Sequence, residues 1–416
     1  MVASISPRIG RLFDEYQHGG TDALDKFWRE VAAGGTPLIE EPDGISALVT
    51  FVWRGSADST NTAWGVNLPL HRFIDTDLWY GSVRLPLDLR TIYFICHDGA
   101  DAVPVEDTGT GLTHVDEHNK EIVYFQHDPR DQSDWDCWAS LLELPAAPDE
   151  PWSVPRTDVR HGSLTEELLP SIALNDTRCI SVYLPPAVRT DGLPLLVIFD
   201  GYIGRNLQRI PATLDNLIAA GKIPPLVALF VHGRDDRRSE ELTPTQRMLD
   251  FTTRELLPWA RRRWRVTDDP SQRVISGASL GGLTAMFIAL RAPDCFGAVL
   301  SQSGVFWWPA PEQGQSELLI REYAAATRKP LRFYLDVGDR ETMPGHGGTA
   351  STLATNRKMR DTLLNQGYDV TYAEHHGGHD PISWRRTIAD GLIAVLGAYS
   401  QPSGHAHLLT ANWTKN

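Results

Sequence analysis

A serine in a glycine-rich turn is the residue best placed to do chemistry in this chain. The stretch Gly277-Ala-Ser-Leu-Gly281 fits the pattern G-x-S-x-G, with a strand-like run at 273–276 before it and a helix-like run at 282–291 after it. A strand, a tight turn and a helix form a nucleophile elbow, in which glycines allow the strained turn that exposes the serine hydroxyl. We therefore predict that Ser279 is a nucleophile; an ordinary glycine-rich turn is the alternative.

Three histidines late in the chain could supply the base that a serine hydroxyl needs before it attacks a carbonyl. His375, His376 and His379 follow a strand-like run, where hydrolases with this serine pattern carry their base. The first two continue the strand, whereas two glycines place His379 on a loop, so we predict His379 as the base. The same glycines argue against a helix that would align His375 and His379 on a metal ion, and no metal site is predicted.

An acid should lie between the serine and the histidine, after a strand, to orient the imidazole and stabilise its cation. The segment Leu335-Asp-Val-Gly-Asp-Arg-Glu341 is in that place. Asp336 falls inside the strand pattern, while Asp339 and Glu341 both follow it. Glu341 is the first choice and Asp339 the alternative, because their spacing alone does not separate them.

Two backbone N–H groups are expected to stabilise the oxyanion that forms when an ester carbonyl is attacked. One belongs to Leu280, the residue after the nucleophile. The other should come from the loop after an early central strand, and Val197-Ile-Phe-Asp-Gly201 ends such a strand. The Gly201 amide is therefore the second predicted donor.

The composition excludes several classes of partner. The chain has 416 residues, and 39 basic against 53 acidic side chains give a formal net charge of −14. An acidic chain is a poor non-specific partner for nucleic acid or for an anionic membrane, and neither partner is expected. No apolar run approaches the roughly 20 residues of a membrane span, and the N-terminal residues do not form a secretory signal. A cytoplasmic location is expected.

The length favours two domains. Short β-branched and aromatic runs, bounded by Gly, Asp or Pro, predict an N-terminal β-sandwich within residues 1–150. An amphipathic helix is expected at 21–33, and the proline-rich stretch 144–155 is the predicted linker. The runs that predict strands are 46–53, 78–86 and 91–95.

Beyond the linker, strand-like and helix-like runs alternate, which is typical of a mostly parallel sheet covered on both faces. Together with the serine elbow, this pattern predicts an α/β-hydrolase catalytic domain over residues 151–416. The predicted strands are 180–184, 195–199, 226–231, 274–276, 298–301, 331–337 and 370–374. The predicted helices include 245–263, 282–291 and 356–366.

Longer matches show a resemblance to a known family. The chain resembles the enterochelin (enterobactin) esterases, hydrolases of catecholate siderophores in the esterase-D-like group of α/β-hydrolases. The resemblance covers nearly the whole chain, and its N-terminal part implies that family's immunoglobulin-like β-sandwich. The segments that carry it include Phe199-Asp-Gly201, Arg238-Ser-Glu-Glu-Leu242, Gly277-Ala-Ser-Leu-Gly-Gly282, Ser301-Gln-Ser-Gly304 with Phe306-Trp-Trp308, and Gly377-Gly-His-Asp380 with Trp384-Arg385.

The resemblance implies that Ser279 and His379 are nucleophile and base, and that Glu341 is the acid of the family's G-x-R-E segment. The additional Asp339 departs from that segment and leaves the acid open. The implied substrate is a cyclic trilactone of serine that carries catechol amides, in ferric or metal-free form. Its esters would be hydrolysed to linear catechoyl-serine products. Iron would then be cargo of the substrate, and no cofactor is expected.

An anionic, aromatic substrate calls for arginine and aromatic side chains near the serine. Arg238 matches the family's R-x-x-E-L motif, whereas Tyr202 departs from the family at the mouth of the oxyanion loop. For the two adjacent tryptophans, packing in a core beneath the serine is the alternative. The predicted substrate-binding residues are Arg238, Trp307, Trp308, Trp384, Arg385 and Tyr202.

Two other functions remain open. The same fold could hydrolyse another macrolactone, a peptide ester or a sugar ester in natural-product metabolism, and Tyr202 together with the doubled acid favours this alternative. The chain could also be a catalytically idle binding protein whose β-sandwich recognises a ligand. The complete order of serine, acid and histidine argues against the second alternative. The oligomeric state is not predicted.

Overall fold

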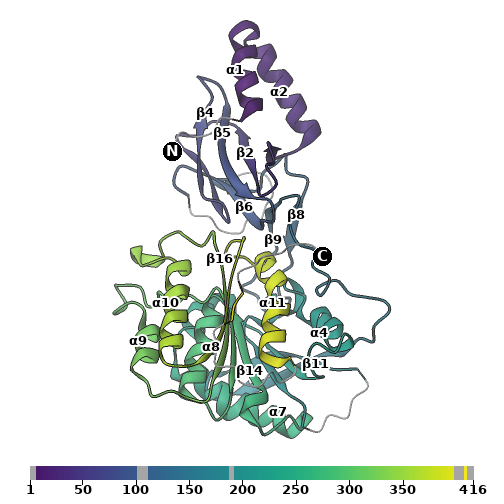
Figure 1. The fold of residues 1–416 in the computed structure, drawn as a ribbon, viewed down its shortest axis with the longest axis vertical. Coiled ribbons are helices and arrows are strands. Elements are labelled where there is room, and N and C mark those ends of the chain that lie inside the picture. Colours follow the sequence, from purple (N-terminus) through teal and green to yellow (C-terminus); the bar gives the residue numbers. More distant parts are fainter. Residues whose placement is uncertain (1–5, 101–110, 187–191, 398–406, 410–416) are drawn as a thin grey trace. The chain divides into compact units, whose positions relative to one another are not determined.

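The computed structural model describes residues 6–100, 111–186, 192–397 and 407–409 (Figure 1). The chain divides into two compact units, and neither is a single continuous stretch of sequence. The first unit comprises Met1–His127, Trp135–Asp149 and His376–Asp380, and the second comprises Asp128–Asp134, Glu150–His375 and Pro381–Asn416.

Two helices open the first unit: α1 (Pro7–Gly19) and α2 (Thr21–Gly34). The hydroxyl of Ser6 caps α1 by accepting hydrogen bonds from two backbone N–H groups of its first turn, which have no partner within the helix. Helix α2 confirms the amphipathic helix predicted at 21–33. Leu12 of α1 and Phe27 of α2 are buried in one apolar cluster with Val52 and Leu78, so both helices are held against strands.

The remaining described elements of the first unit are antiparallel strands, hydrogen-bonded in the order β1-β2-β5-β4-β3-β6-β9-β8, with β7 pairing β6. The strands predicted at 46–53, 78–86 and 91–95 are confirmed as β2, β5 and β6. The strands are β1 (Leu38–Glu40), β2 (Ser46–Arg54), β3 (Thr60–Trp64), β4 (Leu68–Arg72), β5 (Leu78–Pro86), β6 (Arg90–His97), β7 (Thr113–His114), β8 (Ile122–Phe125) and β9 (Cys137–Glu143).

Strand β4 changes partner halfway along its length. Its first residues, Leu68 to Leu70, pair with β3, whereas His71 and Arg72 pair with β5. One buried cluster includes Phe51 of β2 and Ile95 of β6, which lie on opposite sides of this change in the strand order. Side chains from the two halves of the strand path therefore share a core.

The second unit is built on a mixed sheet with the order β10-β11-β13-β12-β14-β15-β16-β17-β18. The pairs from β13 to β18 are parallel, and β10 and β11 add two antiparallel pairs at one edge. The strands are β10 (Ser163–Ser171), β11 (Asp176–Leu184), β12 (Leu195–Ile198), β13 (Val227–Val231), β14 (Arg273–Ala278), β15 (Ala298–Gln302), β16 (Arg332–Gly338), β17 (Asp369–His375) and β18 (His407–Leu409).

All seven strands predicted beyond the linker are confirmed, as β11 to β17. Strand β10 was not predicted. Its burial pattern shows why, since most of its residues are exposed and it presents no regular alternation of apolar and polar side chains. Its extended conformation is held by antiparallel pairing with β11 along its whole length.

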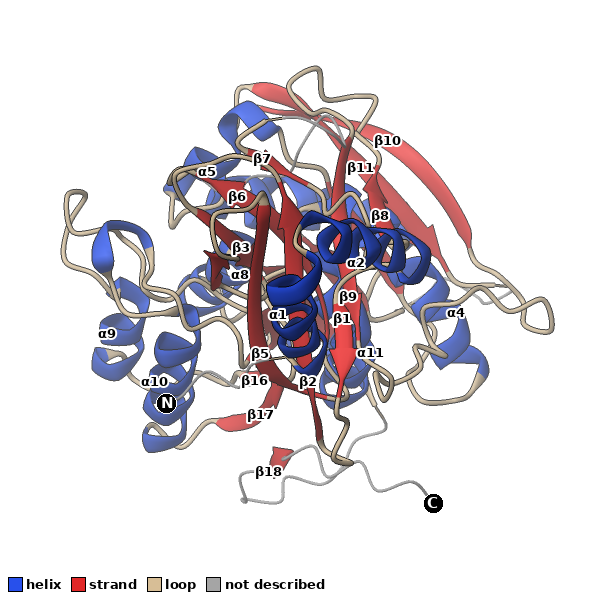
Figure 2. Cartoon of the chain, turned by 90° about the horizontal axis from the view of Figure 1, so that it is seen from above, coloured by secondary structure: helices blue, strands red, loops and turns tan. Residues whose placement is uncertain are grey.

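Helices cover both faces of this sheet. Figure 2 shows α8, α9 and α10 on one side of β16, and α4 and α11 on the other. Two separate apolar clusters form the core beneath these two layers. The helices are α3 (Gly201–Asn206), α4 (Ile210–Ala219), α5 (Arg238–Glu241), α6 (Gln246–Asp250), α7 (Leu257–Trp264), α8 (Leu280–Arg291), α9 (Leu318–Ala325), α10 (Thr352–Asn365) and α11 (Pro381–Leu396).

The helix predicted at 245–263 is helical but not uniform. A π-helical segment, η2 (Phe251–Leu256), joins α6 to α7. Pro258 lies in the first turn of α7 and has no N–H to donate to the carbonyl four residues earlier. A regular α-helical ladder therefore cannot run through this point. Within the described part of the chain, no helix is long and apolar enough to cross a membrane.

Candidate active site

The predicted elbow is confirmed: β14 leads directly into Ser279, and α8 begins at the next residue. Ser279 has φ 58° and ψ −121°, a backbone conformation that costs a non-glycine residue free energy and is typical of functional sites. Its N–H donates a 2.9 Å hydrogen bond to the carbonyl of Gln302 at the end of β15. The neighbouring parallel strand thus helps to hold the strained turn.

The glycines of the elbow are required by close approaches of backbone atoms. A Cβ added at Gly277 would lie 2.5 Å from the carbonyl carbon of Gly281, and one at Gly282 would lie 2.4 Å from the hydroxyl oxygen of Ser301. Real Cβ atoms do not tolerate such distances. The spacing of glycines in the motif therefore reflects how tightly β14, the turn and α8 pack together.

The predicted oxyanion loop follows β12. Asp200 has a left-handed conformation with φ 51°, and Gly201 begins α3. A Cβ at Gly201 would lie 2.5 Å from the backbone of Phe230 in β13, so only glycine fits there. Gly201 and Leu280, the two predicted oxyanion donors, both stand at helix starts after strands β12 and β14, which are adjacent and parallel.

Arg238 clamps this loop from α5. Its Nε and Nη2 donate to the two carboxylate oxygens of Asp200 at 2.8 and 2.7 Å, the bidentate geometry that suits arginine and carboxylate. The Asp200 side chain is only 8% exposed, and that of Arg238 is 28% exposed. Arg238, which the sequence predicted to bind substrate, thus has a carboxylate partner within the second unit.

The two candidate acids differ in their surroundings. Glu341 is buried, and its Oε1 accepts hydrogen bonds from the hydroxyl of Ser303 at 2.5 Å and from the N–H of Gly338 at 2.8 Å. The Asp339 side chain is 27% exposed and lies 3.6 Å from the guanidinium of Arg340. Both follow β16, as predicted. Of the two side chains, Glu341 is the buried one.

Ser303 and Trp384 hold Glu341 in place through hydrogen bonds that the sequence did not predict. Ser303 has φ 48°, and its hydroxyl accepts a 2.8 Å hydrogen bond from the indole N–H of Trp384 while donating to Glu341. The family-like string that contains Ser303 was the available signal, but the string does not show what the serine touches.

Asp336 lies next to this network, at full burial inside β16. Burial raises its pKa to about 7, against opposing hydrogen bonds from Thr387 and Gln302, and the charge of Glu341 raises the pKa further.

His379 belongs to the first unit, as part of the segment His376–Asp380 that follows β17 in the chain. Its backbone carbonyl accepts a 2.9 Å hydrogen bond from the indole N–H of Trp64. His375 is the last residue of β17, and His376 lies 3.8 Å from Asp88. The prediction that His375 continues the strand is confirmed, and the same prediction for His376 is wrong, because β17 ends at His375.

The other predicted substrate-binding residues lie in different surroundings. Trp307 and Trp308 are half-buried and pack against the larger apolar core of the second unit. Tyr202 is half-buried, with its ring 5.8 Å from that of His232. Trp384 is buried, and Arg385 donates to the carboxylate of Glu150 at 2.5 Å. Three of these aromatic side chains therefore keep partial exposure.

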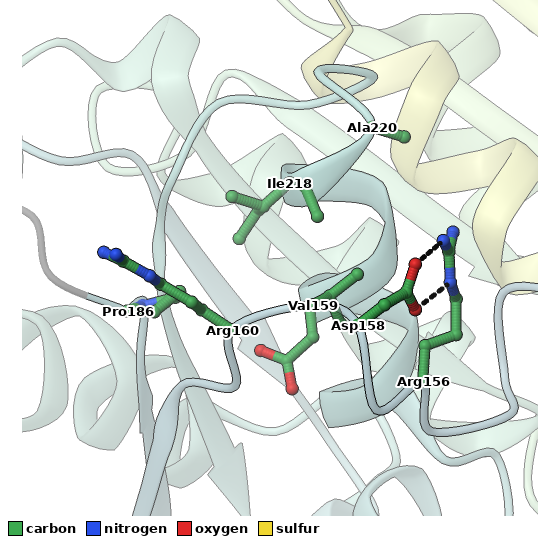
Figure 3. A pocket seen from close by; sticks show the side chains of 9 residues that line it. Arg156, Asp158, Val159, Arg160, Pro186, Ile218 and Ala220 are labelled. Atoms are coloured by element: carbon green, nitrogen blue, oxygen red, sulfur yellow. Dashed lines mark hydrogen bonds and ion pairs between the residues drawn. The ribbon is translucent and has the colours of Figure 1, made fainter.

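Among the described residues, no group of three or more His, Cys, Asp or Glu side chains could hold a metal ion. Figure 3 shows a pocket of about 560 Å³ in the second unit, with Arg156, Asp158 and Arg160 in its wall. Arg156 already donates twice to Asp158, at 3.0 and 2.5 Å. None of the predicted site residues lines this pocket.

Known proteins share both the sequence and the fold. The Esterase family model, described as "Putative esterase", matches residues 171–395. The iron(III) enterobactin esterase of Dickeya dadantii is 31% identical over 421 residues, which cover 89% of this chain and 93% of the relative. The iron(III) salmochelin esterase of Escherichia coli O6:H1 is 27% identical over 428 residues, which cover 94% of this chain and 98% of the relative.

The crystal structure of the enterobactin esterase from Shigella flexneri superposes with a TM-score of 0.67 at 23% identity, and covers 89% of this chain and 97% of that chain. This likeness supports the α/β-hydrolase fold of the second unit. With a serine elbow built as the sequence predicted, and similarity along nearly its whole length, the chain belongs to the esterase family that includes the iron(III) enterobactin esterases, and it is a carboxylic ester hydrolase.

Proposed function

We propose that this protein hydrolyses the ester bonds of a catecholate siderophore trilactone of the enterobactin type, ferric or metal-free, to linear catechoyl-serine products. The observation that carries the proposal is the 31% identity, over 89% of the chain, to a protein named iron(III) enterobactin esterase. Iron enters as cargo of the substrate, and its release is aided when the trilactone is opened. No cofactor takes part in the hydrolysis.

The proposed reaction has two halves. The hydroxyl of Ser279 attacks an ester carbonyl while His379 takes its proton, and the N–H groups of Leu280 and Gly201 stabilise the oxyanion. The C–O bond to the leaving serine hydroxyl then breaks, and His379 returns the proton to that oxygen. Water, activated by His379, hydrolyses the acyl-enzyme and regenerates Ser279.

Glu341 is the acid in this proposal and Asp339 is the alternative. Support comes from the burial of Glu341 and from the two hydrogen bonds that orient its carboxylate. An acid that orients an imidazole must itself be fixed, because loss of orientation is costly to catalysis. The partly exposed Asp339 side chain has weaker support for this role.

The substrate-binding residues divide into two groups. We propose that Trp307, Trp308 and Tyr202, which keep partial exposure, offer ring faces to catechol groups. Arg238, Trp384 and Arg385 bind Asp200, Ser303 and Glu150, respectively. For this second group we propose a supporting role through these partners in place of direct contact with the substrate.

We also propose that residues 1–150 form an immunoglobulin-like β-sandwich domain and that 151–416 form the catalytic domain. The change of partner along β4 and the core shared by β2, β5, β6 and β9 support two sheets packed face to face. A cytoplasmic location is proposed as well, because none of the four cysteines forms a disulfide bond, as is usual in a reducing compartment.

The decisive test is a chromatographic time course with an enterobactin-type trilactone, with and without iron, on the wild type and on Ser279→Ala. Linear trimer, dimer and monomer should appear with the wild type and not with the variant. An ester panel run beside it separates the alternative function. Faster turnover of a non-catechol macrolactone, peptide ester or sugar ester by the same serine would replace the siderophore proposal.

A further inference from the structure

The first unit contains a short segment that is far from the rest of that unit in sequence. His376–Asp380 belongs to it, whereas the residues on either side of this segment belong to the second unit. Two side chains of the β-strands hold the segment by hydrogen bonds. The indole N–H of Trp64 donates to the carbonyl of His379 at 2.9 Å, and the hydroxyl of Thr91 donates to a carboxylate oxygen of Asp380 at 2.7 Å.

The segment also packs against the strands through glycine. A Cβ added at Gly378 would lie 2.7 Å from the Cα of Gly65 and 2.6 Å from the hydroxyl oxygen of Thr91. A Cβ at Gly65 would lie 2.8 Å from the carbonyl oxygen of Ile92 and still nearer to Thr91. The two glycine backbones therefore meet at a distance that no side chain allows, and Thr91 closes the contact.

Both donors are themselves fixed. Trp64 ends β3 with φ 85°, an uncommon conformation for a non-glycine residue, and its ring packs edge-on against Phe94 at 5.6 Å between centroids. Thr91 is fully buried within β6, and Asp380 is fully buried as well. A buried carboxylate is stable only with hydrogen-bonded partners, so the Thr91–Asp380 hydrogen bond anchors the loop strongly.

We infer that Trp64 and Thr91 are positioning residues for the proposed base: they seat the loop of His379 on the β-strands of the first unit. The inference rests on the proposed role of His379. A base must be held close to its productive geometry, and a loop with two successive glycines does not hold it without support. All the contacts on which this inference rests lie within the first unit.

Two variants each remove one hydrogen-bond donor and keep most of the shape: Trp64→Phe and Thr91→Val, made singly and together. Their matched controls are Trp79→Phe and Thr50→Val in the same unit. Trp79 donates its indole N–H to Gly55 at 3.3 Å, and Thr50 shares a 2.8 Å hydrogen bond with Ser82. Thr91→Ser keeps the hydroxyl and serves as the conservative variant.

The readouts are kcat and KM for a small activated ester, p-nitrophenyl acetate, and for the enterobactin-type trilactone, together with circular dichroism and thermal unfolding. We expect the double variant to lose about 10- to 100-fold in kcat on both esters, because displacing a catalytic group by about 1 Å has an effect of this size. KM should stay nearly unchanged. Thr91→Ser should retain most of the activity. Both controls should match the wild type, even where they lower the unfolding temperature.

Two results would overturn the inference. One is a folded double variant with the kcat of the controls. The other is a defect limited to KM for the trilactone, which would assign Trp64 and Thr91 to substrate binding. If Thr91→Val fails to fold, Trp64→Phe alone decides, since it removes the indole N–H and keeps an aromatic ring at this position.

His379→Gln, assayed on the small ester, separates this inference from the proposed function. Full activity of that variant would refute the role of His379 as base and the inference with it. An inactive His379→Gln beside a fully active double variant would refute the inference alone. If the wild type does not cleave the trilactone, the small ester still reports the effect of the variants on kcat. The inference can therefore be tested even if the siderophore proposal is wrong.

Discussion

Ser303 donates a 2.5 Å hydrogen bond to Oε1 of Glu341 and, through the same oxygen, accepts one from the indole N–H of Trp384. The serine hydroxyl thereby has a fixed direction, and so does the carboxylate it binds. This relationship separates Glu341 from Asp339, which the spacing of residues in the sequence could not do.

Replacing each acid by its amide should therefore give unequal results. We expect Glu341→Gln to lower kcat by about 10²- to 10⁴-fold, as removal of the orienting acid does in serine hydrolases. Without the carboxylate, the imidazole is no longer held in the correct tautomer and its cation is no longer stabilised. Asp339→Asn should change kcat by less than about threefold. Steady-state hydrolysis of an activated ester measures both. A larger loss in Asp339→Asn would make Asp339 the acid.

The clamp of Arg238 on Asp200 predicts a defect in kcat. In Arg238→Gln the oxyanion loop loses its bidentate partner, and we expect kcat to fall about 10- to 100-fold because the Gly201 N–H leaves its place, while KM stays nearly constant. Arg238→Lys should recover part of the loss. Arg357→Gln breaks a similar bidentate pair with Glu374 and is the control. A rise in KM with unchanged kcat would show that Arg238 binds substrate.

Two glycine-to-alanine substitutions should have opposite effects on stability. Gly277→Ala forces a Cβ to 2.5 Å from Gly281, so we expect loss of activity and a free energy of unfolding lower by about 3 kcal/mol or more. Gly10 lies inside α1 with open space around it, and Gly10→Ala should raise the free energy of unfolding by about 0.5–1 kcal/mol. Urea unfolding measures both. A stable, active Gly277→Ala would contradict the tight elbow.

Asp336 predicts a dependence of stability on pH. Its pKa is about 7 in the folded protein, above the ordinary value of 3.8, so the folded state keeps a proton that the unfolded state has released. The stabilisation is complete below the unfolded pKa and is lost as pH rises through about 7. Between about pH 5 and pH 8, the wild type should therefore lose about 3 kcal/mol relative to Asp336→Asn.

Urea unfolding of both proteins across this pH range tests the prediction. The asparagine cannot titrate, so the difference between the two free energies of unfolding isolates the carboxyl group. Parallel curves would show that Asp336 is ionised in the folded protein at all these pH values.

The sequence by itself determined the local elements of this protein. The elbow was predictable because its glycines, its strand and its helix are consecutive, and steric limits within a few residues dictate the turn. The central strands were predictable for a similar reason: a strand buried on both faces is apolar along its length, which the sequence shows directly. Strand β10 is mostly exposed and depends on its pairing with β11, so its pattern predicted nothing.

Only the tertiary structure decided which partners these elements hold. Arg238 meets Asp200 across 38 residues of sequence, Ser303 meets Glu341 across 38, and Trp64 meets His379 across 315. Such pairs depend on which strands lie side by side and on which side chains are cut off from water. The sequence does not show whether a carboxylate becomes buried or stays exposed to water. Glu341 and Asp339 therefore differ visibly only in the folded chain, where Glu341 is buried and the Asp339 side chain is 27% exposed.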